Sequence, residues 1–266
     1  MRSETKVRSN AFKHRALIEC KRLKASLRTH AQHLMETHAF CLKTRMSLLP
    51  SPHTIFISGG TGYMGRGLIA QLVQRGHRVR ALVRSGSENK LPQGCEVVLG
   101  NALAAVSFQH QIAPADTFVH LVGVSHPNPS KAEQFRTIDL ASVQASVPAA
   151  LAVHVKHFVY VSVAQPAPVM QVYVQVRAEC ERIIRASELN ATFVRPWYVL
   201  GPGHRWPYLL KPMYWLFKKI PATRATATRL GLVTLKQMIA TLTWAIENPA
   251  SGVRVLEVEQ IRRGMI

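Results

Sequence analysis

Long hydrophobic runs, patterned cysteines and acidic residues are all scarce in this 266-residue sequence. No stretch approaches the roughly 18 consecutive apolar residues of a membrane-spanning helix, which predicts a soluble or peripheral protein. The four cysteines have no CxxC or Cys/His ligand spacing and are too few for a disulfide framework in a chain of this length. We therefore expect no metal site and a reducing, cytoplasmic setting.

Basic residues outnumber acidic ones by 34 to 14, and the imbalance is greatest at the N-terminus. Residues 1–45 contain eleven Lys or Arg and three Glu, a net charge of +8. This N-terminal extension has four interpretations: a basic arm for nucleic acid, one for a membrane surface, a mitochondrial-type presequence, or a stretch that is not native because translation begins at Met46. No nucleic-acid recognition module follows, and net charge alone argues only for association, so we expect no specific nucleic-acid partner.

From His53 onward, short β-rich runs alternate with helical stretches. Continuous apolar runs that each precede a helix are typical of a parallel sheet covered on both faces. The sequence therefore predicts an α/β fold with a doubly wound parallel sheet within residues 46–266. From about residue 197 the pattern loosens, which predicts a small C-terminal cap that contacts substrate. The expected strands are 54–58, 78–83, 96–100, 117–123, 157–163 and 191–197, with a last one near 252–258.

A glycine turn joins the first expected strand to the first expected helix. Gly59, Gly62 and Gly65 form a GxxGxxG pattern there. The first glycine permits a tight turn, the second lets the backbone approach a pyrophosphate, and the third lets the helix pack close to the strand. The helix that begins near Tyr63 directs its unpaired N–H groups at the phosphates. The turn therefore predicts a dinucleotide site; the alternative is a glycine-rich turn without a ligand.

The residue after the second strand indicates which dinucleotide is bound. Proteins that bind NAD usually place an acid there for the ribose 2′-hydroxyl, and this sequence has Arg84. Together with Arg66, Arg84 suits a 2′-phosphate through charge-assisted hydrogen bonds. NADP(H) is therefore favoured over NAD(H), the alternative being that both arginines are solvated surface residues.

Several segments resemble the short-chain dehydrogenase/reductase superfamily: ISGGTGYMGRGL, ALVRS, HLVG, HFVYVSV and ATFVRPWYVLGPG. Within it they are most similar to the atypical, NmrA-like or complex-I-accessory-subunit-like branch of NAD(P)-binding proteins. The resemblance covers roughly His53 to Gly203. It implies a Rossmann fold whose seven parallel strands follow the order 3-2-1-4-5-6-7, with the cofactor across the C-terminal ends of the strands.

Strand ends supply further candidates for the cofactor site. Many relatives place Asp after the third strand to accept from the adenine amino group, and Asn101 lies there. Gly123 ends the fourth strand, where the backbone would face the cofactor, and Pro196 ends the sixth. The full set expected to bind the cofactor is Gly59, Thr61, Gly62, Tyr63, Met64, Gly65, Arg84, Asn101, Ala102, Leu121, Val122, Gly123 and Pro196.

The resemblance also implies catalytic residues. Enzymes of this superfamily carry Tyr-x-x-x-Lys on the helix after the fifth strand and a Ser or Thr before it. The matching residues are Tyr173 as general acid/base, Arg177 in place of the lysine, and Ser162 near the substrate oxygen. Arg177 can supply positive charge but cannot relay a proton as lysine does. The alternative roles are structural: a packed tyrosine, a surface arginine and a serine that caps backbone.

Substrate contacts are expected beyond the sixth strand, at Tyr198 and His204. The segment 206–221, WPYLLKPMYWLFKKIP, is interpreted as an apolar wall of the substrate cleft or a core helix, and the former implies a bulky apolar substrate. A peripheral membrane contact through its aromatic face is less favoured, because Pro212 limits a long amphipathic helix.

Two functions are consistent with these residues. The first is an NADP(H)-dependent oxidoreductase or epimerase-like enzyme that acts on a small apolar carbonyl or hydroxyl compound. The second is a non-catalytic NADP(H)-binding redox sensor or scaffold. The feature that separates them is the pair formed by Tyr173 and Arg177.

Overall fold

The computed structural model describes residues 52–202, 226 and 228–264. They belong to the second of two compact units of the chain, Pro52–Ile266. The basic N-terminal extension, the segment 206–221 and His204 lie outside the described residues. Within the described residues, no helix is long and apolar enough to cross a membrane.

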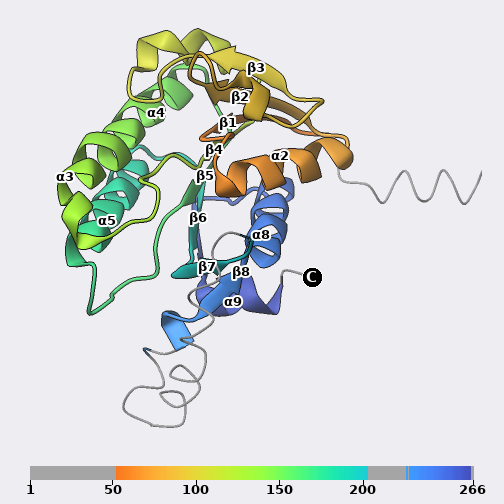
Figure 1. Ribbon diagram of the computed structural model, residues 1–266. Helices are drawn as coiled ribbons and strands as arrows, with labels where there is room; N and C mark the ends of the chain where they lie inside the picture. Colours follow the sequence, from red (N-terminus) through yellow and green to blue (C-terminus); the bar gives the residue numbers. More distant parts are fainter. Residues whose placement is uncertain (1–51, 203–225, 227, 265–266) are drawn as a thin grey trace, which may run out of the picture. The chain divides into compact units, whose positions relative to one another are not determined.

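Seven parallel strands form the central sheet in the order β3-β2-β1-β4-β5-β6-β9 (Figure 1). The chain starts in the middle of the sheet, builds outward to one edge and then returns to build the other half. The predicted doubly wound α/β fold and its strand order are thereby confirmed, with β9 as the seventh strand. The strands are β1 Thr54–Ser58, β2 Arg78–Val83, β3 Glu96–Leu99, β4 Thr117–His120, β5 His157–Val161, β6 Ala191–Arg195 and β9 Val253–Glu257.

Helices cover both faces of this sheet: α2 and α8 lie on one face, and α3, α4 and α5 on the other (Figure 1). The main α-helices are α2 Tyr63–Gln74, α4 Ala141–Ala152, α5 Gln171–Ala186, α8 Leu235–Glu247 and α9 Val258–Arg263. The other described helical segments are η1 Glu88–Lys90, η2 Ala105–Ser107, η3 Gln109–Gln111, η4 Pro129–Lys131, α3 Ala132–Gln134 and the π-helix η5 Phe135–Leu140. Beyond β6, β7 Tyr198–Leu200 pairs with β8 Leu232–Thr234 in a separate two-stranded sheet.

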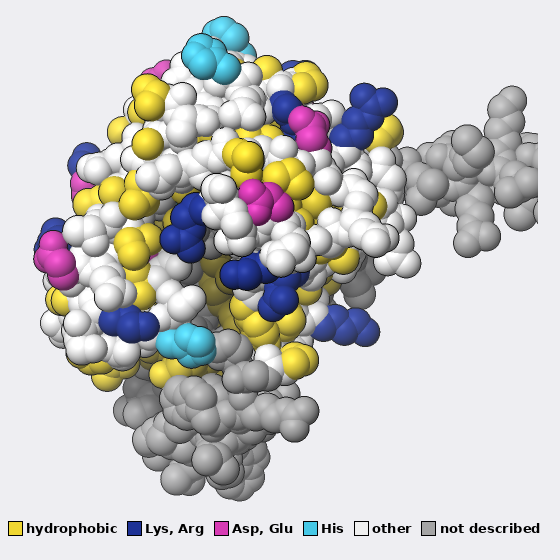
Figure 2. All heavy atoms as spheres, turned by 45° about the horizontal axis from the view of Figure 1, so that its top comes forward, with side chains coloured by type: hydrophobic (Ala, Val, Ile, Leu, Met, Phe, Trp, Pro, Cys, Tyr) yellow, Lys and Arg dark blue, Asp and Glu magenta, His cyan; other side chains and the backbone are white. Residues whose placement is uncertain are grey.

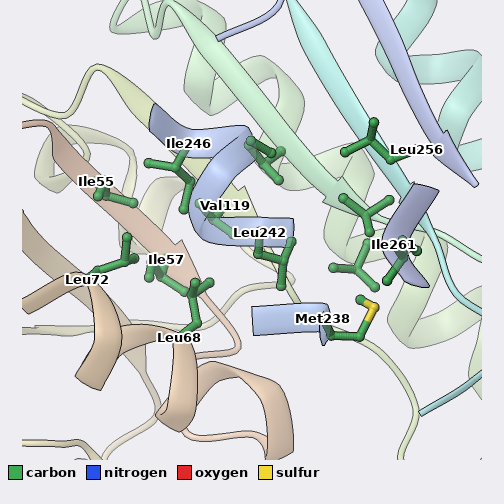
Figure 3. Close-up of a cluster of buried hydrophobic side chains, with 14 of the residues drawn as sticks. Ile55, Ile57, Leu68, Leu72, Val119, Met238, Leu242, Ile246, Leu256 and Ile261 are labelled. Atoms are coloured by element: carbon green, nitrogen blue, oxygen red, sulfur yellow. The ribbon is translucent and has the colours of Figure 1, made fainter. Parts of the chain in front are cut away.

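Alternation along the strands sends side chains into two hydrophobic cores. On β1, Ile55 and Ile57 point to the face covered by α2 and α8, whereas Phe56 points to the face covered by α4 and α5. Figure 3 shows the first core, in which the β1 isoleucines lie near Leu68 and Leu72 of α2. Because β1, β4 and β5 in the middle of the sheet are buried on both faces, their sequences are largely apolar runs, which is what made these strands predictable.

Two histidines, His120 and His157, are completely buried in the sheet. The His120 ring bridges the hydroxyls of Ser58 and Ser142, at 3.0 and 3.1 Å, and Ser142 donates its own proton to the carbonyl of Asp139. Ser142 therefore accepts from Nε2 of His120, so this nitrogen carries a proton. Burial lowers the pKa of His120 to about 3 and that of His157 to about 4.

We expect the fold to lose stability as the pH falls below 6.5, the ordinary pKa of histidine. The unfolded chain protonates His120 and His157 near that pH, whereas the folded chain keeps them neutral down to about 3 and about 4. The unfolded state thus binds more protons in this window, and linkage favours it as the pH falls. Urea midpoints measured at about pH 7 and about pH 5 test this. A double variant, His120→Gln with His157→Gln, should show a smaller pH dependence; an unchanged dependence would rule out these histidines as its source.

Candidate cofactor-binding site

The three glycines of the turn between β1 and α2 have different surroundings. Gly59 has a φ of +81°, and a Cβ there would lie 2.8 Å from the backbone carbon of Leu121. A Cβ on Gly65 would lie 2.5 Å from the carbonyl oxygen of Gly59, so this glycine lets α2 sit directly on the turn. Gly62 has an ordinary φ of −73° and provides no side-chain cap for α2. The N–H groups of the first helical turn therefore have no capping side chain, which suits an anionic ligand.

A cleft of about 440 Å³ lies beside this turn, at the C-terminal ends of β1 to β4. Its volume is within the usual range for a cofactor site. Its position is also typical, because open α/β sheets bind ligands where the strand order diverges from the first strand. The lining residues are Gly59, Thr61, Gly62, Leu82, Val83, Arg84, Ser87, Gly100, Asn101, Ala102, Leu103, Leu121, Val122, Gly123, Val124, Ser125, Lys131, Gln134 and Ile138.

Most residues expected to bind the cofactor line this cleft: Gly59, Thr61, Gly62, Arg84, Asn101, Ala102, Leu121, Val122 and Gly123. Four do not. Gly65 is buried where α2 meets the turn, and Met64 packs against the first core. The Tyr63 hydroxyl lies against Gly201, and Pro196 is buried just after β6. These four residues shape the surroundings of the cleft rather than its surface.

The cleft contains no acidic side chain among its described lining residues, but it has two basic ones, Arg84 and Lys131. Arg84 directly follows β2 and is exposed. Lys131 also lines the cleft and donates to the carbonyl of Ser125, at 2.6 Å. Arg66, expected to assist Arg84, does not line the cleft. On the face drawn in Figure 2, Lys and Arg side chains flank a hollow that contains hydrophobic side chains. The cleft therefore favours an anionic ligand.

Sequence reasoning missed one whole wall of the cleft. Ser125, Lys131, Gln134 and Ile138 come from the loop after β4 and from η4, α3 and η5. These residues do not lie at the ends of strands, whereas the sequence predicts cofactor-binding residues at strand ends. Asn101 was found, but its Oδ1 accepts the backbone N–H of Leu103 at 3.0 Å, so one of its two acceptor positions supports the turn.

None of the three expected catalytic residues lines the cleft. Arg177 is only 6% exposed, and its Nη2 lies 3.1 Å from Oδ2 of Asp139. Its Nη1 donates to the Tyr160 hydroxyl at 3.2 Å and to the carbonyl of Val161 at 2.9 Å. The structural alternative for Arg177, a surface charge, is thus wrong, because the guanidinium is held inside the protein.

Tyr173 and Ser162 lie close to this arginine. The Tyr173 ring packs against Phe135, with centroids 4.9 Å apart, and the Arg177 guanidinium lies 5.2 Å from its centroid. Burial raises the pKa of Tyr173, and the positive charge of Arg177 opposes that shift. Ser162 directly follows Val161; it is buried, and its hydroxyl has no hydrogen-bond partner in the described part of the chain. The arrangement provides a protonated phenol, a fixed positive charge and an unpaired hydroxyl.

The structure describes only one of the two residues expected to contact substrate. Tyr198 lies in β7, partly exposed, and His204 is outside the described residues. Among the residues that the structure describes, no group of three His, Cys, Asp or Glu could hold a metal ion.

A parallel sheet of this order, a glycine turn under a helix N-terminus and a cleft at the strand ends whose described lining has no acid define a Rossmann-type dinucleotide-binding protein. Comparison with family models agrees, since the model described as NAD(P)H-binding matches residues 59–205. The chain belongs to this NAD(P)H-binding family. The predicted relationship to the atypical short-chain dehydrogenase/reductases is thereby confirmed.

Individual relatives are distant. A ceramide reductase of Caulobacter vibrioides is 26% identical over 211 residues, which cover 79% of this chain and 65% of that protein. The photosystem II assembly factor Ycf39 of Trieres chinensis is 32% identical over 112 residues, 41% of this chain and 34% of its own. The chain thus spans less than two thirds of either relative. The enzyme WbmH of Bordetella bronchiseptica, solved with NAD+, superposes with a TM-score of 0.58 at 17% identity, covering 77% of this chain and 75% of that one.

We expect Gly62→Ala to abolish nucleotide binding while the fold persists. Alanine tolerates the φ of −73°, and its Cβ would meet only the Gly59 carbonyl, at 3.1 Å, but the methyl would occupy the cleft surface that a pyrophosphate approaches. Gly65→Ala should instead act on the fold: its methyl group would overpack the contact between α2 and the turn and lower the free energy of unfolding by about 1–3 kcal/mol. Urea unfolding and calorimetric titration of NADPH on both variants measure this. If Gly62→Ala binds NADPH as tightly as the unaltered protein, the phosphates of the dinucleotide do not lie against Gly62.

Proposed function

We propose that the protein binds NADP(H) in this cleft and uses it to reduce the carbonyl group of an apolar compound. The cofactor preference rests on one observation: Arg84 directly follows β2, and the described lining has no acid. A carboxylate at that position would bind the ribose 2′-hydroxyl of NAD and repel a 2′-phosphate, whereas an arginine attracts the phosphate. Membership of the NAD(P)H-binding family supports a nicotinamide dinucleotide of either kind.

The proposed chemistry assigns one role to each of three groups, the buried Ser162 and Arg177 and the partly buried Tyr173. NADPH, when bound, supplies a hydride. Tyr173 donates the proton, since burial raises its pKa and keeps its hydroxyl protonated at neutral pH. The unpaired hydroxyl of Ser162 orients the carbonyl oxygen. Arg177 contributes positive charge beside the phenol and exchanges no proton. The similarity to a ceramide reductase supports an apolar substrate.

A second candidate is a non-catalytic NADP(H)-binding scaffold or redox sensor. It is favoured by the position of Arg177, which replaces the family's lysine and whose guanidinium is already engaged by Asp139, Tyr160 and the carbonyl of Val161. The similarity to a photosystem II assembly factor supports an assembly role. In this case the cleft would still bind the dinucleotide, but without turnover.

Arg84→Ala is expected to weaken NADPH binding roughly tenfold or more and to leave NADH binding unchanged. The reason is the loss of charge-assisted bonds to the 2′-phosphate, each worth about 1.5–3 kcal/mol. Calorimetric titrations of both nucleotides measure the effect. Arg78→Ala is the matched control, because Arg78 is an exposed arginine at the other end of β2. If the unaltered protein binds NADH as tightly as NADPH, the preference for the phosphorylated cofactor is wrong.

Tyr173→Phe is expected to slow the NADPH-dependent reduction of long-chain ketones by roughly 10²–10⁴-fold without changing the Kd for NADPH, since only the proton donor is lost. The absorbance of NADPH follows the reaction. An unaltered protein that binds NADPH tightly but oxidises none with any ketone of the panel would favour the scaffold. A Tyr173→Phe variant with full activity would remove this residue from the mechanism.

A further inference from the structure

The helical segment after β4 contains a π-helical turn. From Ala132 to Ala152 the chain runs through α3, η5 and α4, and Phe135–Leu140 is π-helical. A π-turn between α-helical turns is rare and frequently occurs at functional sites, because it changes the direction of the side chains that follow. The acid of this turn, Asp139, is 1% exposed.

Asp139 contacts the wall of the cleft from behind. Its Oδ1 accepts the backbone N–H of Val124 at 2.8 Å, and its Oδ2 lies 3.1 Å from Nη2 of Arg177. Burial raises the pKa of Asp139, while Arg177 and the N–H of Val124 both oppose that shift. Val124 lines the cleft, as does Ile138, the residue just before Asp139.

Arg177 contacts the same wall. A Cβ placed on Gly123 would collide with its Nη2, so the guanidinium occupies the space of a side chain at this cleft residue. The guanidinium is fixed from its other side by Tyr160 and by the carbonyl of Val161. The ion pair therefore touches Gly123 through the arginine and Val124 through the aspartate.

We propose that Asp139 is a positioning residue for the cofactor: paired with Arg177, it fixes the wall formed by Gly123, Val124 and Ile138 against which the dinucleotide packs. This inference rests on the proposed NADP(H) site and adds a residue that the sequence did not single out. It also explains why Arg177 stands where the family carries lysine. A planar guanidinium can contact Asp139, Tyr160 and a backbone carbonyl at once, whereas an ammonium is a compact point charge.

The experiment separates a positioning role from a purely structural one. Asp139→Asn keeps an oxygen for Val124 but leaves Arg177 buried without a counter-charge, so it should lower both the urea midpoint and the affinity for NADPH. In the double variant Asp139→Asn with Arg177→Gln both charges are gone, and the urea midpoint should recover. The affinity should stay about tenfold below that of the unaltered protein, because the wall has lost its charged hydrogen bonds.

A partly buried acid that does not line the cleft provides the control. Glu247 of α8 bonds to Arg75 and His77, and none of the three lines the cleft. Glu247→Gln should lower the urea midpoint and leave NADPH affinity unchanged. A double variant that regains both its midpoint and full NADPH affinity would overturn the proposal, since the pair would then serve the fold alone.

Failure of this inference is distinguishable from failure of the proposed cofactor. The wall is shared by NADPH and NADH, so the double variant should weaken both to the same degree and preserve their ratio, whereas Arg84→Ala changes the ratio. Weakening of NADPH alone in the double variant would overturn a role in the shared wall. An unaltered protein that binds neither nucleotide would overturn the NADP(H) site itself, and with it this inference.

Discussion

The close approach of α2 to the turn after β1 determines where the ligand can bind. Gly65 brings the helix so near that a Cβ would lie 2.5 Å from the carbonyl of Gly59, and Gly59 in turn packs on the backbone of Leu121 in the segment after β4. The turn after β1, helix α2 and the segment after β4 are thus in backbone contact, without side chains between them. This contact presents the N-terminus of α2 to the cleft, and the electrostatic preference for phosphate follows from that geometry.

The scarcity of acids has a structural counterpart. Several of the described acids are engaged in ion pairs away from the cleft surface: Glu247 with Arg75, for example, and Glu181 with Arg195. A pair with an exposed partner, such as Glu247 with Arg75, contributes little net stability, whereas removing a partner of the buried Glu181 is destabilising. These acids link helices to one another and to the sheet, and the charged side chains among the described residues that line the cleft are all basic.

The environment of Arg177 links the two candidate functions. In a reductase, its charge lies beside the Tyr173 phenol and favours donation of a proton to substrate oxygen. In a scaffold, the same guanidinium serves the wall of the cofactor cleft through its contacts with Asp139 and Gly123. The contacts are identical in both cases, so the chemical difference depends on whether a substrate reaches the phenol. The cofactor cleft is common to both functions.

The sequence by itself determined the features that depend on neighbouring residues. Apolar runs identified the strands, since a parallel sheet buries both faces, and the glycine spacing identified the turn, since each glycine acts on backbone a few residues away. Arg84 was found because it adjoins β2. Tertiary structure alone decided that Lys131 and Ile138 line the same cleft as Arg84, and that Asp139 pairs with Arg177. These groups are distant in sequence, and a π-helical turn breaks the periodicity from which their direction could have been calculated. Only the packing of helices on the sheet brings them together.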